Sequence, residues 1–182
     1  MADKFEQLKE QSHPNLMSKS AMMAASGTRG SNELLFSEIL TKVNNAKDKA
    51  KKIAVLKQYD HPSLRMIIKG SFDPSIEWDL PDGTPPYMAN EAPAGTEHTI
   101  LKNDAKRLWH FIKGADKNTT KTQKETLFIQ MLEGLHQDEA QLILDAKNKK
   151  LHKVYKGLSE QVVKEAFNWN DLFVKVEQKY NI

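Results

Sequence analysis

Apolar residues recur every three to four positions over most of the chain, the spacing of one buried face of an α-helix. In the first half this pattern predicts three helices, over residues 31–43, 46–59 and 62–70, with short breaks between them. Ser31 is a suitable N-cap for the first helix, and Pro62 suits the first turn of the third. We expect these three helices to pack into one compact subcluster.

The second half shows the same spacing more clearly. It predicts five further helices, over about residues 100–113, 121–134, 137–150, 160–167 and 171–180. Thr120 and Ser159 can cap two of them, and Gly114 is placed to end the first. No stretch alternates between apolar and polar residues as a half-buried strand would. The predicted fold class is therefore all-α, a multi-helix bundle of two helical subclusters.

Residues 71–99 lack any helical period and hold five of the seven prolines. This long Pro-rich loop is predicted to join the two subclusters. Pro81-Asp82-Gly83 predicts a turn, because proline fixes φ and glycine allows positive φ. The loop also carries aromatic side chains, which either pin it across the helices or form a recognition surface.

The domain prediction follows from these segments. Residues 1–30 contain serine, glycine and methionine with one short helical pattern, which indicates an N-terminal arm without a core of its own. Methionines in this arm could anchor a partner, or the arm has no role. Residues 31–182 are predicted to form a single all-helical domain.

Length and composition narrow the class of protein. A chain of 182 residues suits one domain. It contains no cysteine, which excludes disulfides, thiolate metal sites and cysteine nucleophiles. No apolar run approaches the roughly 18 residues of a membrane span, and no secretory signal pattern opens the chain. We therefore expect a soluble intracellular protein.

The basic residues are mostly lysine, since only Arg29, Arg65 and Arg107 are arginines among 27 basic side chains. Arginine supplies the planar fork that reads guanine edges, so base-specific DNA recognition is disfavoured. Lysines can still bind phosphates without reading sequence. An AT-rich genome would explain the same lysine bias.

Two lysine groups in the second half form the candidate nucleic-acid interface, with one tyrosine that could stack on a base. Its members are Lys117, Lys121, Lys124, Lys147, Lys149, Lys150, Lys153, Tyr155 and Lys156. The alternative is a solvated lysine face neutralised by Asp138, Glu139 and Asp145. The nucleic-acid hypothesis requires helix packing to gather both groups into one shared stripe.

A second candidate surface is apolar. Trp78 and Tyr87 in the Pro-rich loop, with Trp169 and Phe173 near the C-terminus, could contact a protein partner. The alternative is that these aromatic side chains belong to the core, which a domain of this size needs.

No catalytic motif accompanies these surfaces. The histidines are scattered and form no metal-binding helix pair, and Gly27-Thr28-Arg29-Gly30 lacks the lysine of a phosphate-binding loop. No Gly-x-Ser-x-Gly nucleophile elbow is present. We therefore predict no enzyme activity, no metal and no small-molecule cofactor.

Two segments resemble a known domain. ILTKVNNAKDKAKKIAVLKQYDHPSLRMIIKGSFDPSIEWDLP and ETLFIQMLEGLHQDEAQLILDAKNKKLHKVYKGLSEQVVKEAF are similar to the N-terminal helical DNA-binding domain of phage-type ATP-dependent DNA ligases. The second includes that domain's G-L-x-x-x-x-V element as Gly157, Leu158 and Val162. The Lys-x-Asp-Gly motif that accepts the nucleotide is absent, so the resemblance implies a binding module without ligase activity.

The GTPPY loop and the lysine bias also resemble uncharacterised small proteins of T-even-like tailed phages, including phages of cyanobacteria. That resemblance implies a phage accessory protein in the host cytoplasm. It would bind DNA non-specifically at a replication, repair or packaging complex. The alternative is a protein-interaction module that inhibits or adapts a host or phage enzyme such as a replication protein, or a minor virion component, binding through the N-terminal arm and the aromatic loop.

Overall fold

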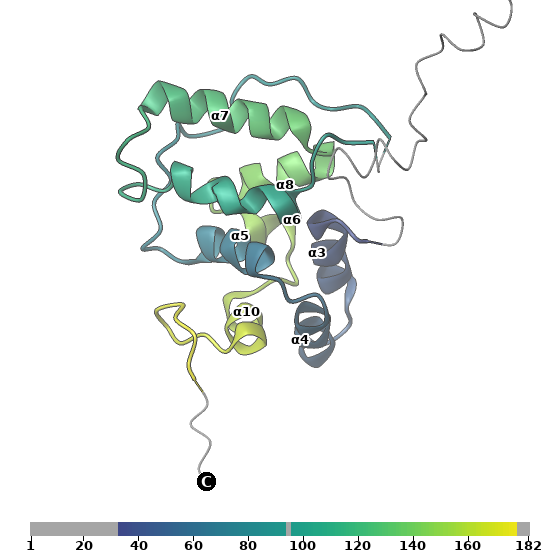
Figure 1. The fold of residues 1–182 in the computed structure, drawn as a ribbon. Helices are drawn as coiled ribbons and strands as arrows, with labels where there is room; N and C mark the ends of the chain where they lie inside the picture. Colours follow the sequence, from purple (N-terminus) through teal and green to yellow (C-terminus); the bar gives the residue numbers. More distant parts are fainter. Residues whose placement is uncertain (1–32, 94–95, 178–182) are drawn as a thin grey trace, which may run out of the picture.

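A computed structural model describes residues 33–93 and 96–177 of the chain (Figure 1). In these residues every regular element is a helix, and β-pairing is limited to two isolated bridges. The all-α prediction is confirmed. The predicted N-terminal arm, residues 1–30, lies outside the described residues.

The first three helices follow the sequence prediction with shifted ends. They are α3 (Phe36–Asn45), α4 (Lys49–Gln58) and α5 (Pro62–Phe72). Helix α3 begins after Leu35 rather than at Ser31, and the Glu38 carboxylate accepts the Leu35 amide at 2.7 Å. Asp48 caps α4 by accepting the Lys51 amide.

The prediction of one α-helix over residues 100–113 is wrong. Only α6 (Leu101–Asp104) is α-helical, and a 3₁₀ helix, η1 (Ala105–Phe111), continues it. Helical spacing of apolar residues fits both forms over two turns, so the pattern could not separate them. Residue 112 is already extended where it meets Trp78 in an isolated bridge.

Three of the next four helices agree closely with the prediction, and the fourth, the short α9, was not predicted. They are α7 (Lys121–Gly134), α8 (Gln137–Lys147), α9 (Leu151–Val154) and α10 (Glu160–Phe167). Thr120 and Gln123 form a reciprocal capping box at the start of α7, and Ser159 caps α10. Helix α8 ends at Lys147, three residues earlier than predicted.

The predicted last helix over residues 171–180 is wrong as far as residue 177. The described part is a turn with one isolated bridge, and Asn168 and Phe173 have positive φ. The Asn170 amide donates to the Val174 carbonyl at 3.0 Å and Phe173 takes φ 54°, so the chain forms a tight turn where a helix was expected.

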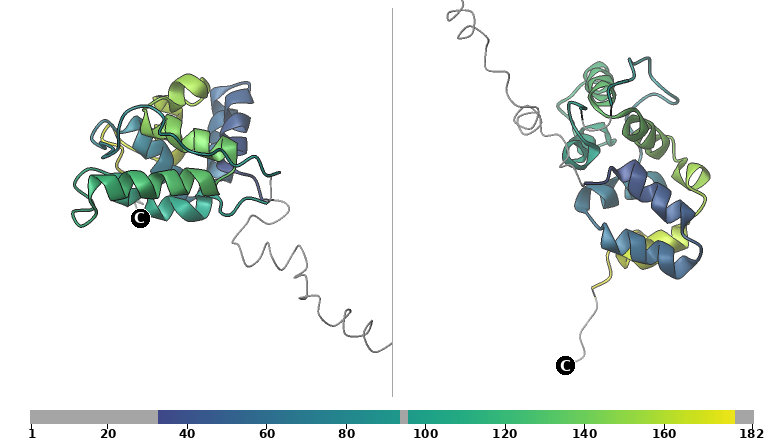
Figure 2. Two further views of the ribbon diagram at one scale, coloured as in Figure 1. Left: turned by 90° about the horizontal axis from the view of Figure 1, so that it is seen from above. Right: turned by 90° about the vertical axis from the view of Figure 1, so that its right-hand side faces the viewer.

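The helices stack in layers (Figures 1 and 2). Helix α7 lies at the top of Figure 1 above α6 and α8, α5 and α3 lie below these, and α4 and α10 form the bottom. Helix α5 contacts α6, η1, α8, α9 and α10. One hydrophobic cluster therefore runs through both predicted subclusters rather than one core in each.

A buried carboxylate joins three of these helices. Glu139 of α8 accepts the backbone amides of Phe36 and Leu101, the first residues of α3 and α6, at 3.1 and 2.7 Å. Burial raises the pKa of Glu139 to about 7. The alternative of a solvated, neutralised lysine face had placed Glu139 at the surface, and nothing in its local sequence marks it as buried.

Candidate nucleic-acid interface

Three of the predicted interface lysines turn into the protein. Lys124 of α7 and Lys147 of α8 are 2 % and 6 % exposed. The Lys124 ammonium donates to the Asp79 carboxylate at 2.8 Å and to the Asp116 carbonyl at 3.0 Å. The Lys147 ammonium donates to the Pro81 carbonyl and to the Asn148 side chain, both at 2.8 Å.

The third lysine, Lys149, caps the C-terminal end of α5, which is far from it in sequence. Its ammonium donates to the carbonyls of Gly70, Asp73 and Ile76 at 2.7, 2.8 and 2.8 Å. Burial lowers the pKa of Lys149, as it does for Lys147. The Lys149 backbone takes φ 58°, which an L-residue seldom adopts, so the contact is held against local strain.

Helix packing therefore divides the predicted interface. With their ammonium groups already bonded to protein oxygens, Lys124, Lys147 and Lys149 are structural and leave the proposed face. Lys117 and Lys121, at the start of α7, remain exposed, as do Lys150, Lys153 and Lys156 around α9.

The two exposed groups belong to different helices. Lys117 and Lys121 lie before and at the start of α7, which begins at the left end of the top layer in Figure 1. Lys150, Lys153 and Lys156 lie in or next to α9, which contacts α5 and α8. With Lys124 turned inward, the first group keeps only two of its three lysines. We treat the second group alone as the candidate interface.

Packing adds one lysine to the second group that sequence reasoning did not place there. Helix α10 packs against α4, and Gly157 donates its amide to the Asn44 side chain at 2.9 Å. A Cβ at Gly157 would lie 3.1 Å from the Lys52 ammonium and 2.9 Å from Asn44 Cα, so only glycine fits this approach. We call Lys52, Lys150, Lys153 and Lys156 the α9–α10 cluster.

Tyr155, the predicted stacking residue, is not placed to stack on a base bound at the α9–α10 cluster. Its ring is half-buried and lines a different pocket, together with Asp138 and Asp145. Burial raises the pKa of Tyr155 to about 12, and the two carboxylates add to the effect. A base stacked there would meet acidic side chains.

The predicted partner-binding aromatics pack inward. Trp78 donates its indole N–H to the Gly70 carbonyl at 3.0 Å, and Tyr87 is half-buried, with a pKa raised by burial. Phe173 is 3 % exposed, and its ring meets that of Trp169 edge-on, with centroids 6.0 Å apart. Of the two alternatives for the loop, its aromatics favour pinning.

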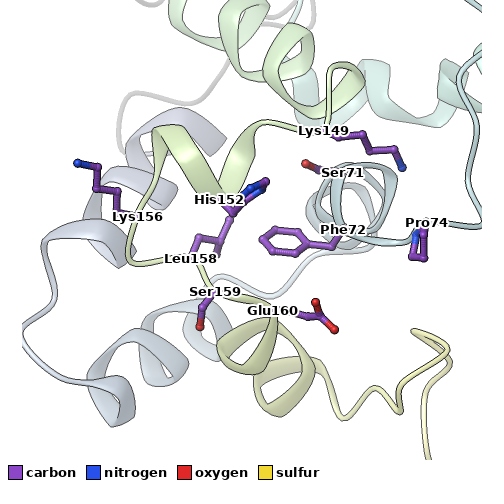
Figure 3. A pocket seen from close by; sticks show the side chains of 9 residues that line it. All are labelled: Ser71, Phe72, Pro74, Lys149, His152, Lys156, Leu158, Ser159 and Glu160. Carbon is purple, nitrogen blue, oxygen red and sulfur yellow. The ribbon is translucent and has the colours of Figure 1, made fainter.

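A pocket opens beside the α9–α10 cluster (Figure 3). It has a volume of about 560 Å³ and lies between the end of α5, α9 and the start of α10. Phe72 projects into its centre, facing His152 and Leu158, while Glu160 stands on the wall away from Lys156. The rings of Phe72 and His152 have centroids 6.2 Å apart.

Together these observations define an all-α protein with an exposed lysine cluster beside an aromatic pocket. The chain belongs to a family of unknown function (DUF6433), which it matches over residues 39–153. No curated protein and no solved structure matches it. Within the described residues, no helix is long and apolar enough to cross a membrane, and no three His, Asp or Glu side chains are grouped to hold a metal ion.

Proposed function

We propose that this protein binds nucleic acid non-specifically through the α9–α10 cluster and has no catalytic role. The observation that carries the proposal is that the cluster lysines have no carboxylate partner among the described residues. Within residues 33–93 and 96–177, no carboxylate lies within 4.0 Å of the ammonium groups of Lys52, Lys150, Lys153 or Lys156.

The neighbouring acidic residues pair with other lysines. Glu165 of α10 pairs with Lys49, and Glu160 pairs with Lys164. Lys51 of α4 pairs with Asp48. These three carboxylates are therefore paired with lysines outside the cluster. The cluster lysines interact with Asp48 and Asp145 only at longer range, so their positive charge is available to a polyanion.

Phosphate binding suits this arrangement better than base reading. Lysine ammoniums on flexible stems meet phosphate oxygens without fixed geometry, and the cluster contains no arginine to read base edges. The resemblance to the DNA-binding domain of phage-type ligases favours the same function. We propose, on that resemblance, a phage accessory protein that acts on nucleic acid in the host cytoplasm.

The test is the salt dependence of binding to a short duplex of random sequence, followed by fluorescence anisotropy. Neutralising four phosphates gives a logarithmic slope of about −3.6, so affinity should fall on the order of a hundredfold between about 50 and 200 mM salt. Affinity that does not change with salt would contradict the proposal.

Two matched variants test which lysines contact the DNA phosphates. Substituting glutamine for Lys150, Lys153 and Lys156 together should reduce the slope to about −1 without changing the circular dichroism spectrum. The control carries the same change at Lys106, Lys117 and Lys121, exposed lysines outside the cluster, and should bind as the unmodified protein does. Lys149 is left unchanged in both variants because its loss would disturb the fold.

A second candidate function, binding to a protein partner, has one specific observation in its favour. The segment after α10 exposes Leu172, Val174 and Val176 at 75 %, 53 % and 52 %. These are not the aromatic residues that the sequence indicated. A partner recovered from a pull-down should then survive nuclease treatment and be lost on Leu172→Ser.

A further inference from the structure

The α5–α9–α10 pocket is lined by a residue with a buried hydroxyl that has no hydrogen-bond partner among the described residues. Ser71 is 6 % exposed, and its Oγ has no partner among the described residues. Serine and threonine within helices usually bond to the carbonyl four residues earlier, as Thr41 and Thr126 do here. A buried hydroxyl without a partner is destabilising, and a ligand that reached the Ser71 Oγ would remove that cost. The Ser37 Oγ beside another pocket also lacks a partner, so Ser71 supports the proposal only together with the pocket's aromatic rings.

The pocket also offers an aromatic surface. Phe72 is half-buried at its centre, and the exposed His152 ring lies across from it at a tilt of 59°. Leu158 and Pro74 complete apolar walls around these rings (Figure 3). Planar aromatic ligands stack on such side chains.

Lysines flank the pocket on two sides. Lys156 stands on one side of Phe72 and Lys149 on the other, while Glu160, whose carboxylate pairs with Lys164, stands below it (Figure 3). A nucleotide suits an aromatic pocket flanked by lysines, because its phosphate carries negative charge and its base offers a planar face. Phosphate would lie toward Lys156, and the base would stack on Phe72 beside Ser71.

We propose that the α5–α9–α10 pocket receives one unstacked base of a single-stranded nucleic acid whose phosphates run along the α9–α10 cluster. This inference rests on the proposed function, since the cluster must hold the strand. A duplex keeps its bases stacked and cannot place one on Phe72. The protein should therefore prefer single strands over duplex, whereas lysine contacts alone would not create that preference.

The test compares single-stranded and duplex DNA of the same mixed sequence in the same salt. We expect the single strand to bind on the order of tenfold more tightly. Phe72→Leu, which keeps apolar packing but removes the stacking ring, should abolish that advantage and leave duplex affinity unchanged. Ser71→Ala should weaken single-strand binding alone, by about threefold or more.

The control is Trp109→Leu, which removes an aromatic ring that is 46 % exposed and does not line this pocket. It should leave both affinities unchanged. If Phe72→Leu fails to fold, Ser71→Ala decides the test, because it removes one atom and no packing surface.

The outcomes separate the two proposals. Equal affinity for both DNA forms, or a single-strand preference that survives both Phe72→Leu and Ser71→Ala, overturns the base pocket. If the lysine variants still lose binding in that case, the proposed function stands. No salt-dependent binding to either form overturns both.

Discussion

Lysines in the continuous stretch 147–156 have two different roles. Lys147 and Lys149 are bonded to backbone carbonyls of the Pro-rich loop and of the end of α5, whereas Lys150, Lys153 and Lys156 extend into solvent. The difference arises where α8 ends. The positive φ at Lys149 turns the chain and aims its side chain at α5. A segment rich in lysine therefore need not place all of its positive charge on the surface.

The same division holds for acids. Glu139 is buried between three helices, while Glu160 and Glu165 pair with surface lysines. Charges inside the protein fix the positions of segments that are far apart in sequence. Charges outside set what the surface can bind. Substitutions on each side of this division should therefore have very different effects on stability.

The largest effect is expected at Lys124. Lys124→Met would leave the Asp79 carboxylate and the Asp116 carbonyl without their shared donor. Loss of the ammonium from this part-buried pair, with the Asp116 carbonyl also left unpaired, should lower the free energy of unfolding by about 3 kcal/mol or slightly more. Urea unfolding measures it, with Lys121→Met on the same helix as a control. Equal stability of the two variants would contradict the inward placement of Lys124.

The next effect depends on pH. The pKa of Glu139 rises from its usual 4.5 to about 7 in the folded protein, so the folded state keeps a proton that the unfolded chain has lost. The contribution of Glu139 to stability should be greatest below pH 4.5 and should fall by about 3 kcal/mol as the pH rises to about 7.

The matched variant for this prediction is Glu139→Gln, which cannot titrate. The difference in unfolding free energy between the variant and the unmodified protein should change over that pH interval, and denaturant unfolding at several pH values measures it. Parallel pH profiles for the two proteins would show that Glu139 ionises normally and is not buried as described.

A smaller loss is expected at Lys149. Lys149→Met would leave three carbonyls at the end of α5 without their donor, at a cost of about 2 kcal/mol. The adjacent Lys150→Met supplies the comparison and should cost almost nothing. Thermal unfolding followed by circular dichroism distinguishes them. A reversed order would show that the boundary between inner and outer lysines is misplaced.

The smallest effect on stability is expected for the α9–α10 cluster itself. Glutamine at Lys153 and Lys156 should change the free energy of unfolding by less than about 0.5 kcal/mol, because both side chains are exposed. Denaturant unfolding checks this. A loss comparable to that of Lys149→Met would assign these lysines a structural role instead.

Local signals made much of the fold predictable. Pro62, Thr120 and Ser159 each mark a helix start that the structure confirms, since proline and hydroxyl caps act within a few residues. The helix expected after Asn170 is replaced by a turn, in which Asn170 bonds to Val174 and Phe173 has positive φ. The spacing of apolar residues alone does not reveal such a turn.

The site was less predictable, because long-range packing determines which charges are free. The partners of Lys149 lie more than seventy positions earlier in the chain. Lys52 joins the cluster only because α4 packs on α10. The close approach of Gly157 to Asn44 could not be predicted from one sequence, because it joins segments more than one hundred positions apart.

The division between inner and outer lysines can be measured by lysine acetylation of the native protein, read by mass spectrometry with and without single-stranded DNA. Without DNA, we expect Lys124, Lys147 and Lys149 to react slowly and Lys150, Lys153 and Lys156 to react fast. DNA should then protect the α9–α10 cluster, Lys52 included, while Lys117 and Lys121 keep reacting. Protection centred on Lys117 and Lys121, or fast reaction at Lys124 and Lys149, would show that the division is wrong.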